Sequence, residues 1–166
     1  MVTFTVKLTS KDMMDYNMYH NYRNVSGIAS LILGIIMLVL FVVSGSDSDV
    51  NISYRLLMVF FGLFFTVFTP VRIALKSAQQ VKLTPSFTKP LKYTVSKESI
   101  IIEQDDMKAE FPMSEVYKVS DTGKSIVVYV NKVRAYIFPK RDIGDSYNEL
   151  IRIIREAIPA KKVKVK

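Results

Sequence analysis

Residues 25–44 read VSGIASLILGIIMLVLFVVS, a run of twenty residues without a single charge. An α-helix rises about 1.5 Å per residue and the hydrocarbon core of a bilayer is about 30 Å thick, so this run is long enough to cross a membrane. A second uncharged run, residues 56–71, has sixteen residues. It is a few residues short, but the flanking Arg55 and Arg72 have side chains that reach toward the interfaces. The sequence therefore predicts two spans, at about 25–44 and 55–72.

A secretory signal peptide is the alternative explanation of the first run. The apolar region of a signal peptide has about 7–15 residues, which is shorter than this run. The preceding segment also contains Asp12 and Asp15 among its basic residues, unlike the positive start of a signal peptide. Ser44-Gly45-Ser46 fits a small-residue cleavage site, however, and this alternative stays open.

The distribution of charge predicts the orientation of the spans. The chain has a formal net charge of +8, and residues 72–92 contain five lysines and arginines but no acid. The connector between the two runs contains only Asp47 and Asp49 as charged residues before Arg55. Because lysine and arginine near span ends prefer the cytoplasm, we expect a multi-pass protein of the inner (cytoplasmic) membrane with both termini cytoplasmic. No recognition helix or RNA-binding aromatic motif accompanies the charge, so a nucleic-acid partner is not expected.

Small residues recur at four-residue spacing in both runs, which predicts how the spans pack. In an antiparallel hairpin centred near Ser48, Gly34 lies at the same depth as Gly62. Small side chains let helix backbones approach closely, and hydroxyl groups can bond across the contact. A chance alignment of small residues is the alternative. The residues expected at this contact are Ser26, Ser30, Gly34, Gly62 and Thr66, with Pro70 opposite Ser26.

The N-terminal segment combines a strand pattern with a helix start. Residues 1–8 alternate apolar and polar side chains, as in a strand with one buried face. Thr9 or Ser10 fits a helix N-cap, and Asp12 follows Thr9 at the capping-box spacing. We expect a polar helix from there to about residue 24 that runs into the first span. His20 fits an interfacial side chain on this helix, with a pH sensor as the alternative.

Beyond the second span, the pattern changes to short strands. Residues 73–83 continue as a short helix, which Pro85 and Pro90 end. The strands that follow are joined by short connections with turn residues, which is typical of an antiparallel meander. These strands are expected at 91–95, 99–103, 107–111, 116–120, 125–130 and 133–138.

The C-terminal part is predicted to be a helix and a basic tail. Asp142 fits the N-cap of a helix that Pro159 ends. Apolar residues at three- and four-residue steps give this helix one apolar face, which should cap the open end or face of the sheet. The last seven residues contain four lysines and are expected to be a mobile tail.

Together these patterns predict a membrane α+β fold: a two-helix transmembrane hairpin plus a small antiparallel β-sheet or barrel capped by a C-terminal α-helix. The expected parts are an N-terminal strand and interfacial helix at 1–24, the transmembrane hairpin at 25–72, a basic connector at 73–90, a cytoplasmic sheet domain at 91–158 and a basic tail at 159–166.

This order of elements resembles the YcxB-like family of small bacterial membrane proteins. The resemblance depends on FPMSEVYKV at 111–119, SIVVYV at 125–130 and AYIFPKR at 135–141. Phe111 and Phe138 depart from the residues usual in that family but keep their apolar character. The resemblance implies a C-terminal domain similar to bacterial pleckstrin-homology-like (PH-like) domains, a bent antiparallel barrel capped by one helix. It implies no assigned activity and supplies no catalytic residues.

Lys140 and Arg141 are the only candidate binding residues in the sequence. They lie between the last predicted strand and a helix N-terminus, where a phosphate or an anionic lipid headgroup can bind. A surface basic pair beside an Asp cap is the alternative. The chain has no cysteine and one histidine, and its paired carboxylates lack a partner base, so no metal, cofactor or catalytic site is expected.

The expected function is that of a membrane-tethered docking or regulatory module, not an enzyme. Its partners would be the bilayer, anionic lipid headgroups, and an unidentified protein or further copies of the chain. The alternative is a small channel or an accessory subunit of a membrane transporter, assembled through the hairpin. Neither run contains an ionisable residue, which disfavours a charged pore.

Overall fold

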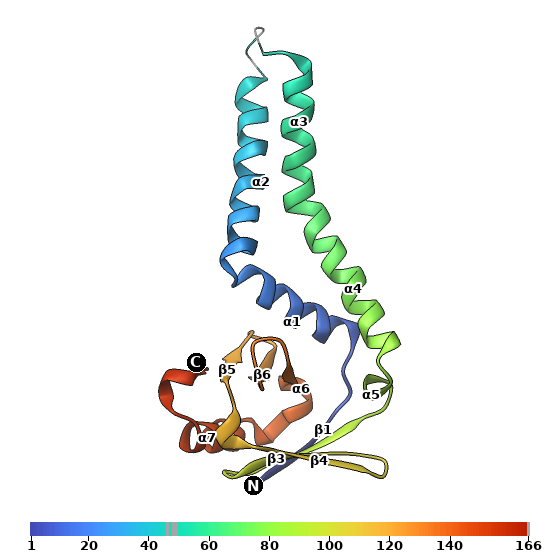
Figure 1. Cartoon of the computed structure of the whole chain (residues 1–166), viewed down its shortest axis with the longest axis vertical. Coiled ribbons are helices and arrows are strands. Elements are labelled where there is room, and N and C mark those ends of the chain that lie inside the picture. Colours follow the sequence, from blue (N-terminus) through green and yellow to red (C-terminus); the bar gives the residue numbers. More distant parts are fainter. Residues whose placement is uncertain (46, 48–49, 166) are drawn as a thin grey trace. The chain divides into compact units, whose positions relative to one another are not determined.

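The computed structural model describes residues 1–45, 47 and 50–165, and the expected turn centre at Ser48 lies outside the described residues. The chain has a mixed α+β fold (Figure 1). It divides into two compact units: a β-rich unit, Met1–Tyr16 with Ala78–Lys166, and a helical unit, Asn17–Ser77. The β-rich unit is thus built from both ends of the chain, and the helical unit is built from the segment between them.

The helical unit contains both apolar runs as long helices. The first run forms α2 (Val25–Ser44), with the boundaries expected from the sequence. The second run begins at Ile52 in α3 (Ile52–Leu63) and continues through a π-helical turn, η1 (Phe64–Phe68), into α4 (Thr69–Leu83). Both helices are long and apolar enough to cross a membrane, which by itself is weak support for a membrane span.

The π-helical turn lies immediately before a proline. Pro70 has no N–H and would crowd the carbonyl four residues earlier in a regular α-helix. The wider turn changes this local pattern: the backbone N–H of Thr69 bonds to Phe64 O, five residues back. The helix therefore continues past Pro70 to Leu83.

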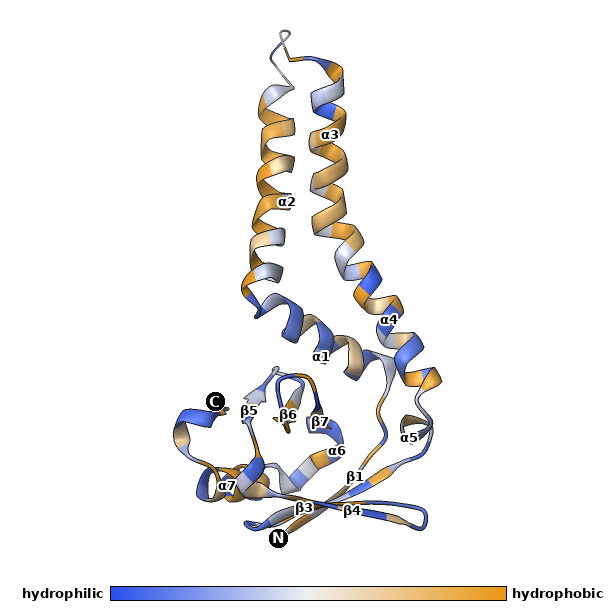
Figure 2. Ribbon diagram, in the orientation of Figure 1, coloured by the Kyte–Doolittle hydropathy of each residue, from blue (hydrophilic) through white to orange (hydrophobic). Residues whose placement is uncertain are grey.

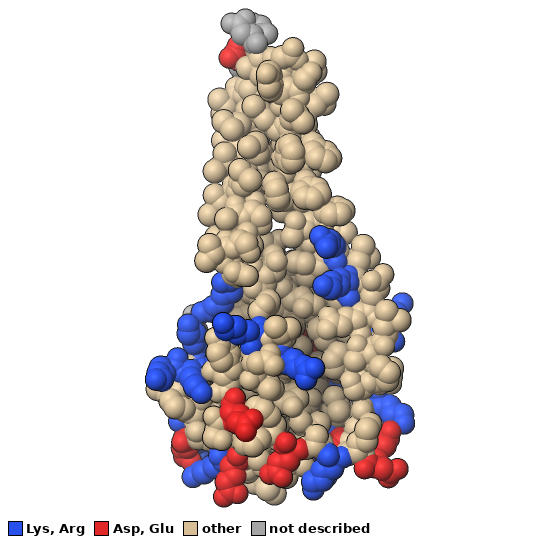
Figure 3. Space-filling view, viewed as in Figure 1, with Lys and Arg blue, Asp and Glu red and all other residues tan. Residues whose placement is uncertain are grey.

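Hydrophobic side chains cover the outer surface of the helical unit. Figure 2 shows α2 and α3 largely orange, and α4 with more blue residues. In the space-filling view, the visible surface over α2 and α3 is mostly tan, and Lys and Arg atoms begin over α4 (Figure 3). Val42 and Val43, for example, are 72% and 69% exposed.

The N-terminal helix α1 (Ser10–Tyr22) is separate from α2. The sequence predicted that it runs into the first span, and this prediction is wrong because Asn24 adopts an extended backbone conformation. At its other end the predicted N-cap is confirmed, since the backbone N–H of Thr9 and the carboxylate of Asp12 bond at 2.8 Å.

The first sheet of the β-rich unit contains the N-terminal strand. Its order is β1-β2-β3-β4, and every neighbouring pair is antiparallel. β1 alternates buried and exposed residues as predicted, and it pairs with β2 so that Phe4 lies opposite Tyr93. The strands are β1 (Val2–Val6), β2 (Leu91–Val95), β3 (Ser99–Gln104) and β4 (Met107–Pro112).

The second sheet has the order β7-β6-β5-β8. The pairs β5–β6 and β6–β7 are antiparallel, as predicted, but β8 joins β5 in parallel. A short 3₁₀ turn, η2 (Met113–Glu115), separates the two sheets along the chain. The strands are β5 (Lys118–Asp121), β6 (Ser125–Tyr129), β7 (Ala135–Pro139) and β8 (Val163–Lys164).

One hydrophobic core joins the two sheets and the C-terminal helix. Phe138 of β7 contacts Phe4 and Tyr93 of the first sheet, with ring centroids 5.1 and 4.9 Å apart. The apolar face of α7 (Tyr147–Ala157) buries Leu150 and Ile154 in the same core, as expected from its spacing. Aromatic rings of this size supply much of the area removed from water on folding.

The chain reaches α7 through short helical turns instead of a single helix start. After β7 come two short turns, α6 (Lys140–Ile143) and η3 (Gly144–Ser146). Another short helix, α5 (Pro85–Thr88), precedes β2. Asp142 therefore lies inside α6, and the prediction that it is the N-cap of the last helix is wrong. Gly144, at a φ of 57°, makes the left-handed bend between the two turns.

The C-terminal segment is ordered as far as it is described, so the expected mobile tail is wrong for residues 160–165. It forms η4 (Ala160–Lys162) and then β8, where Val163 lies opposite Val119. Val163 and Val165 pack against the core, and Lys162 donates to Val116 O at 2.8 Å. Burial of two valines outweighs the tendency of a lysine-rich segment to stay solvated.

Candidate functional site: an ion-paired cluster and a helix contact

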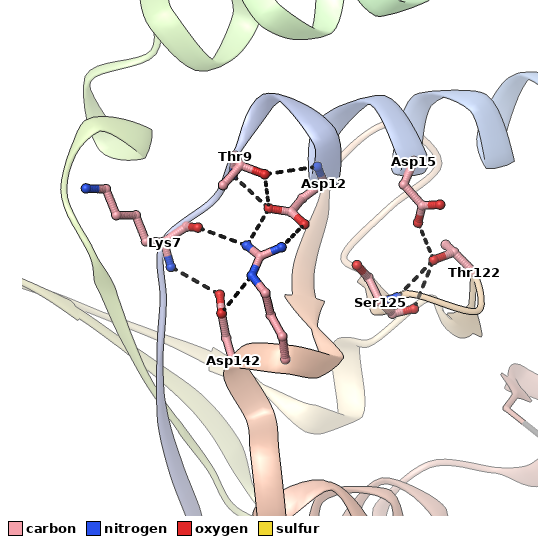
Figure 4. A network of polar contacts seen from close by, with 8 residues as sticks. Lys7, Thr9, Asp12, Asp15, Thr122, Ser125 and Asp142 are labelled. Atoms are coloured by element: carbon pink, nitrogen blue, oxygen red, sulfur yellow. Dashed lines mark hydrogen bonds and ion pairs between the residues drawn. The ribbon is translucent and has the colours of Figure 1, made fainter.

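Arg141, one of the two expected anion-binding residues, is held by two carboxylates of its own chain, Asp12 and Asp142, which are labelled in Figure 4. Its two terminal nitrogens, Nη1 and Nη2, each lie 2.7 Å from an oxygen of Asp12. Its Nε lies 3.1 Å from Asp142 Oδ1. A guanidinium bound to a carboxylate by two parallel hydrogen bonds is both strong and geometrically specific.

Asp12 has a second role at the start of α1. Its Oδ2 accepts from the backbone N–H and from the hydroxyl of Thr9, at 2.8 and 2.6 Å. Thr9 Oγ1 in turn lies 3.4 Å from the backbone N of Asp12. This is the reciprocal arrangement of a capping box, so one carboxylate fixes the helix start and connects it to α6.

The environment of Asp12 favours its charged form. The residue is 6% exposed, and this burial alone would raise the pKa of the carboxyl group. The hydrogen bonds from Arg141 and Thr9 outweigh burial, and the pKa of Asp12 lies below its ordinary value of 3.8. Asp12 is therefore a charged, paired carboxylate at neutral pH.

Asp142 extends the cluster to Lys7, the residue that follows β1. Its Oδ2 accepts from the backbone N–H of Lys7 at 3.4 Å, and Arg141 Nη2 lies 3.4 Å from Lys7 O. Because α6 has only four residues, its start offers no extended helix dipole for an anion. The helix N-terminus that the sequence predicted behind Lys140 and Arg141 is therefore not part of this site.

Lys140 is paired with a different carboxylate. Its Nζ lies 2.9 Å from Asp121 Oδ2 and 5.3 Å from the ring centroid of Tyr147. Burial alone would lower the pKa of the Lys140 ammonium group, but Asp121 and Tyr147 outweigh it, so the pKa lies above the ordinary value. The ammonium group is thus a charged contact between α6, β5 and α7.

The expected anion contact at Lys140 and Arg141 stays a prediction, and the structure gives it a competitor at each cation. A phosphate would have to displace Asp121 from Lys140 and Asp12 from Arg141, or share each cation with its carboxylate. Neither partner was predicted from the sequence. Asp12 precedes Arg141 by 129 residues and was predicted only as part of a helix cap, and Asp121 precedes Lys140 by 19. No local pattern relates residues at these separations.

A further polar contact joins α1 to the β5–β6 turn. The hydroxyl of Thr122 donates to Asp15, and the backbone N–H of Ser125 donates to Thr122 Oγ1 at 3.1 Å (Figure 4). The turn also contains Gly123 at a φ of 97°, where a side chain would be strained. Within the β-rich unit, the first two turns of α1 are therefore attached at two places, α6 and the β5–β6 turn.

In the helical unit, Gly34 and Gly62 lie at the contact between α2 and α3. Both are buried, and a Cβ built on Gly34 would lie 3.3 Å from Gly62 O. It would also lie 2.9 Å from Phe65 Cβ and Thr66 Cγ2, while a Cβ on Gly62 would lie 2.5 Å from Leu38 Cδ2. Two glycines here let the backbones approach to a distance that any side chain would prevent.

The expected hydroxyl residues lie differently. Ser30 donates to Gly27 O at 2.9 Å and Thr66 donates to Gly62 O at 2.7 Å, so each hydroxyl bonds to its own helix. Ser26 is exposed, and the buried residue beside it is Gly27. The small-residue contact thus depends on glycine backbones more than on hydrogen bonds between helices.

Asp105 of the β3–β4 turn has a structural contact. Asp105 adopts a φ of 49° at the turn and pairs with Lys89 Nζ at 2.6 Å. Within residues 1–45, 47 and 50–165, no three His, Asp or Glu side chains lie together in a way that could hold a metal ion.

Residues 95–154 match the family model described as YcxB-like protein. The resemblance expected from the sequence is thereby confirmed for this segment, which extends from the end of β2 into α7. No curated protein and no solved structure matches the chain.

Proposed function

We propose, with the YcxB-like segment as the premise, that this chain is an inner-membrane protein whose β-rich unit is a docking or regulatory module tethered to the bilayer. The observation that carries the proposal is the contrast between the two units. The β-rich unit buries most of its apolar residues in one core, while the helical unit exposes most of its apolar side chains. Soluble proteins rarely expose apolar patches of that extent, and a membrane is one of their usual partners.

The composition of the long helices supports the bilayer as that partner. α2 contains no ionisable residue, and the next helix has none between Arg55 and Arg72. Arg72, Lys76 and Lys82 are exposed on α4, past the second apolar run. On the positive-inside rule, we propose that this end, and with it both termini and the β-rich unit, is cytoplasmic.

The architecture of the β-rich unit supports a binding role. Two four-stranded sheets and α7 share one core, which is compatible with the PH-like architecture that the family resemblance implies. Small sheet domains of that kind serve as binding platforms, an argument by analogy of fold. We propose a protein partner for this platform, in keeping with the partner expected from the sequence.

Anionic lipid headgroups are a further proposed contact, at Lys140 and Arg141. Arg141 keeps half of its side chain exposed despite its pairing with Asp12. Replacement of Arg141 by Ala is an unsuitable test, because it leaves the buried Asp12 without its cation. Lys140→Gln is the better variant, because the amide of glutamine can still donate a hydrogen bond to Asp121. The measurement is crosslinking of the reconstituted chain to anionic headgroups compared with neutral ones, and the proposal expects this preference to fall in the variant.

The alternative function, a channel or transporter subunit, has one observation in its favour. A hollow on the outer surface of the second apolar helix is lined by Phe60, Leu63, Phe64, Val67, Phe68 and Val71. Phe60, Phe64 and Phe68 stack along it, with centroids 6.1 and 5.0 Å apart. An apolar helix of another subunit could pack there, in which case the hairpin would be the interaction site.

One experiment separates these two functions. A photo-crosslinking residue at Val133, which is 81% exposed on the β6–β7 connection, captures partners of the β-rich unit in native membranes. A second probe at Leu40, 43% exposed on α2, captures partners of the hairpin. Residues 25–72 are then exchanged for an unrelated two-helix hairpin.

A docking module keeps the Val133 adduct, of unchanged mass, after the exchange. A channel or transporter subunit loses its partner, and its principal adduct comes from Leu40 before the exchange. Loss of the Val133 adduct from a chain that still inserts into the membrane contradicts the docking proposal.

A further inference from the structure

β4 is an edge strand with an unused side. It lies at the end of the first sheet, and in the described part of the chain no strand pairs with its outer edge. All of its residues are exposed except Phe111, which is partly buried. Edge strands with free backbone groups are templates for pairing with another strand, and proteins normally protect them.

The phase of hydrogen bonding shows which backbone groups of β4 are free. The β3–β4 turn has two residues, Asp105 and Asp106, so Gln104 and Met107 flank it as a hydrogen-bonded pair. Alternation then directs the N–H and C=O of Lys108 and Glu110 away from β3. Pro112, which has no N–H, also falls on the outward phase, and the backbone N of Met113 returns to bond Glu98 O at 2.8 Å.

The side chains of β4 form a pattern that is complementary to itself. Residues 107–111 read Met-Lys-Ala-Glu-Phe, with an apolar residue at each end and opposite charges around a central alanine. We propose that two copies of this chain associate by antiparallel pairing of their β4 strands about a two-fold axis at Ala109. Lys108 then lies opposite Glu110 of the second copy, and Met107 lies opposite its Phe111.

The backbone phase fits this arrangement. Lys108 and Glu110 of the second copy, whose free backbone groups face each other, form a hydrogen-bonded pair. Ala109 faces itself as a non-hydrogen-bonded pair, where Cα atoms approach to about 4.5 Å. The register that pairs opposite charges is therefore also the register in which the free backbone groups meet. The side-chain pattern and the hydrogen-bond phase are independent observations.

Both faces of the extended sheet gain favourable neighbours. On the polar face, Lys92 and Lys108 already lie 3.3 Å from Glu103, and Glu110 of the second copy continues this row of alternating charge. On the apolar face, Met107 is 69% exposed and gains an aromatic neighbour. Cross-strand pairs of these types stabilise sheets, while like charges directly opposite destabilise them.

Charge also selects the register. A two-fold axis moved to Lys108 would place two lysines opposite each other, and an axis at Glu110 would do the same with two glutamates. A slip of one residue would turn the apolar face of one copy to the polar face of the other. The axis at Ala109 is the one that pairs opposite charges, which favours a second copy over a strand of unrelated sequence.

The test uses disulfide crosslinking of the full chain, which has no cysteine of its own. Ala109→Cys places two thiols within disulfide distance across the proposed axis. Thr3→Cys is the matched control, since Thr3 is an exposed residue on β1, the opposite edge strand of the same sheet, which α6 contacts. Both variants are oxidised in native membranes and the dimer is quantified on non-reducing gels.

The proposal expects a disulfide-linked dimer from Ala109→Cys and only background from Thr3→Cys. In the Ala109→Cys chain, Lys108→Glu or Glu110→Lys alone should slow dimer formation by roughly tenfold, because each dimer then contains two like-charge pairs. The double variant Lys108→Glu/Glu110→Lys restores the opposite charges and should recover most of the rate, which a general loss of folding would not allow.

Equal crosslinking of the Ala109→Cys and Thr3→Cys variants overturns the proposal. A disulfide adduct whose mass is that of a foreign protein overturns it as well, and assigns the edge to a different partner. If neither single charge change slows dimer formation, pairing at this register is excluded.

Discussion

Asp12 is the residue in which local and long-range structure meet. It completes the capping box of α1 with Thr9 and binds the guanidinium of Arg141 through both oxygens. The side chain of Arg141 is half exposed while that of Asp12 is 7% exposed, so solvent screens the pair from one side only. In this position, removal of one member destabilises the fold mainly because it leaves the other charge without its partner.

We expect Asp12→Asn to lower the free energy of unfolding by about 1–3 kcal/mol, the usual loss for a hydrogen bond to a charged group in a partly buried site. The measurement is denaturant unfolding of the purified chain in mild detergent, followed by the fluorescence of its nine tyrosines, since it has no tryptophan. Asp106→Asn, in the exposed β3–β4 turn, is the matched control and should change stability by less than about 0.5 kcal/mol.

The same variant predicts a pH dependence. The pKa of Asp12 in the folded protein lies below its ordinary value of 3.8, so the folded state binds the proton less readily than the unfolded state. The stabilisation from Asp12 is therefore present above the unfolded pKa and is lost as the pH falls through the folded pKa. The difference between wild type and Asp12→Asn should be constant near neutral pH and shrink below pH 3.8. A difference that grows on acidification would show that the sign is wrong.

At the scale of elements, the close contact of α2 with α3 depends on two glycines. Gly34 and Gly62 leave no room for a side chain, since a Cβ on either would lie within 3.0 Å of a neighbouring atom. The hydroxyls of Ser30 and Thr66 bond within their own helices, so they add little across the contact. Backbone proximity and dispersion are therefore the forces that join this hairpin.

Gly34→Leu should separate the two helices and destabilise the hairpin by about 1–3 kcal/mol, the usual cost of overpacking a tight contact. Ala29→Leu is the control, because Ala29 is exposed on the same helix and its enlargement meets no neighbour. Stability is measured by titration of the reconstituted chain with a denaturing detergent. Equal effects of the two substitutions would mean that the glycine contact is not the site of close approach.

At the scale of the whole molecule, the two chain ends build one unit and the middle of the chain builds another. β1 lies next to β2 in the first sheet, although the two apolar helices separate them in sequence. The β-rich unit is therefore complete only when the chain has returned from the hairpin. If the hairpin spans a bilayer, as proposed, this pairing requires both ends of the hairpin to emerge on one side.

That requirement gives a topology prediction. In spheroplasts, a membrane-impermeant maleimide should label Asp47→Cys, in the connector between the helices, without opening the cells. Lys124→Cys, in the exposed β5–β6 turn, should be labelled only after lysis. The absence of native cysteine removes background labelling. Labelling of both positions from the same side, or release of the chain by alkaline carbonate, would contradict the proposed membrane orientation.

The sequence by itself determined the elements whose patterns are local. The length of an uncharged run set α2, the two-residue alternation set β1, and the Thr9–Asp12 spacing set the start of α1. These features depend on helix rise, strand periodicity and capping, which operate over a few neighbouring residues. For the same reason the antiparallel pairs β2–β3, β3–β4, β5–β6 and β6–β7 were predictable from their short connections. The predicted meander was wrong between β4 and β5, which lie in different sheets.

Tertiary structure alone decided which distant elements meet. The pairing of β1 with β2, the separation into two sheets, the order of the C-terminal segment in β8 and the contact of Arg141 with Asp12 all join residues far apart in sequence. These contacts are stabilised by burial of apolar side chains in one core and by charge pairing at the margin of that core. Those energies exist only once the chain is folded, so no local pattern in the sequence contains them.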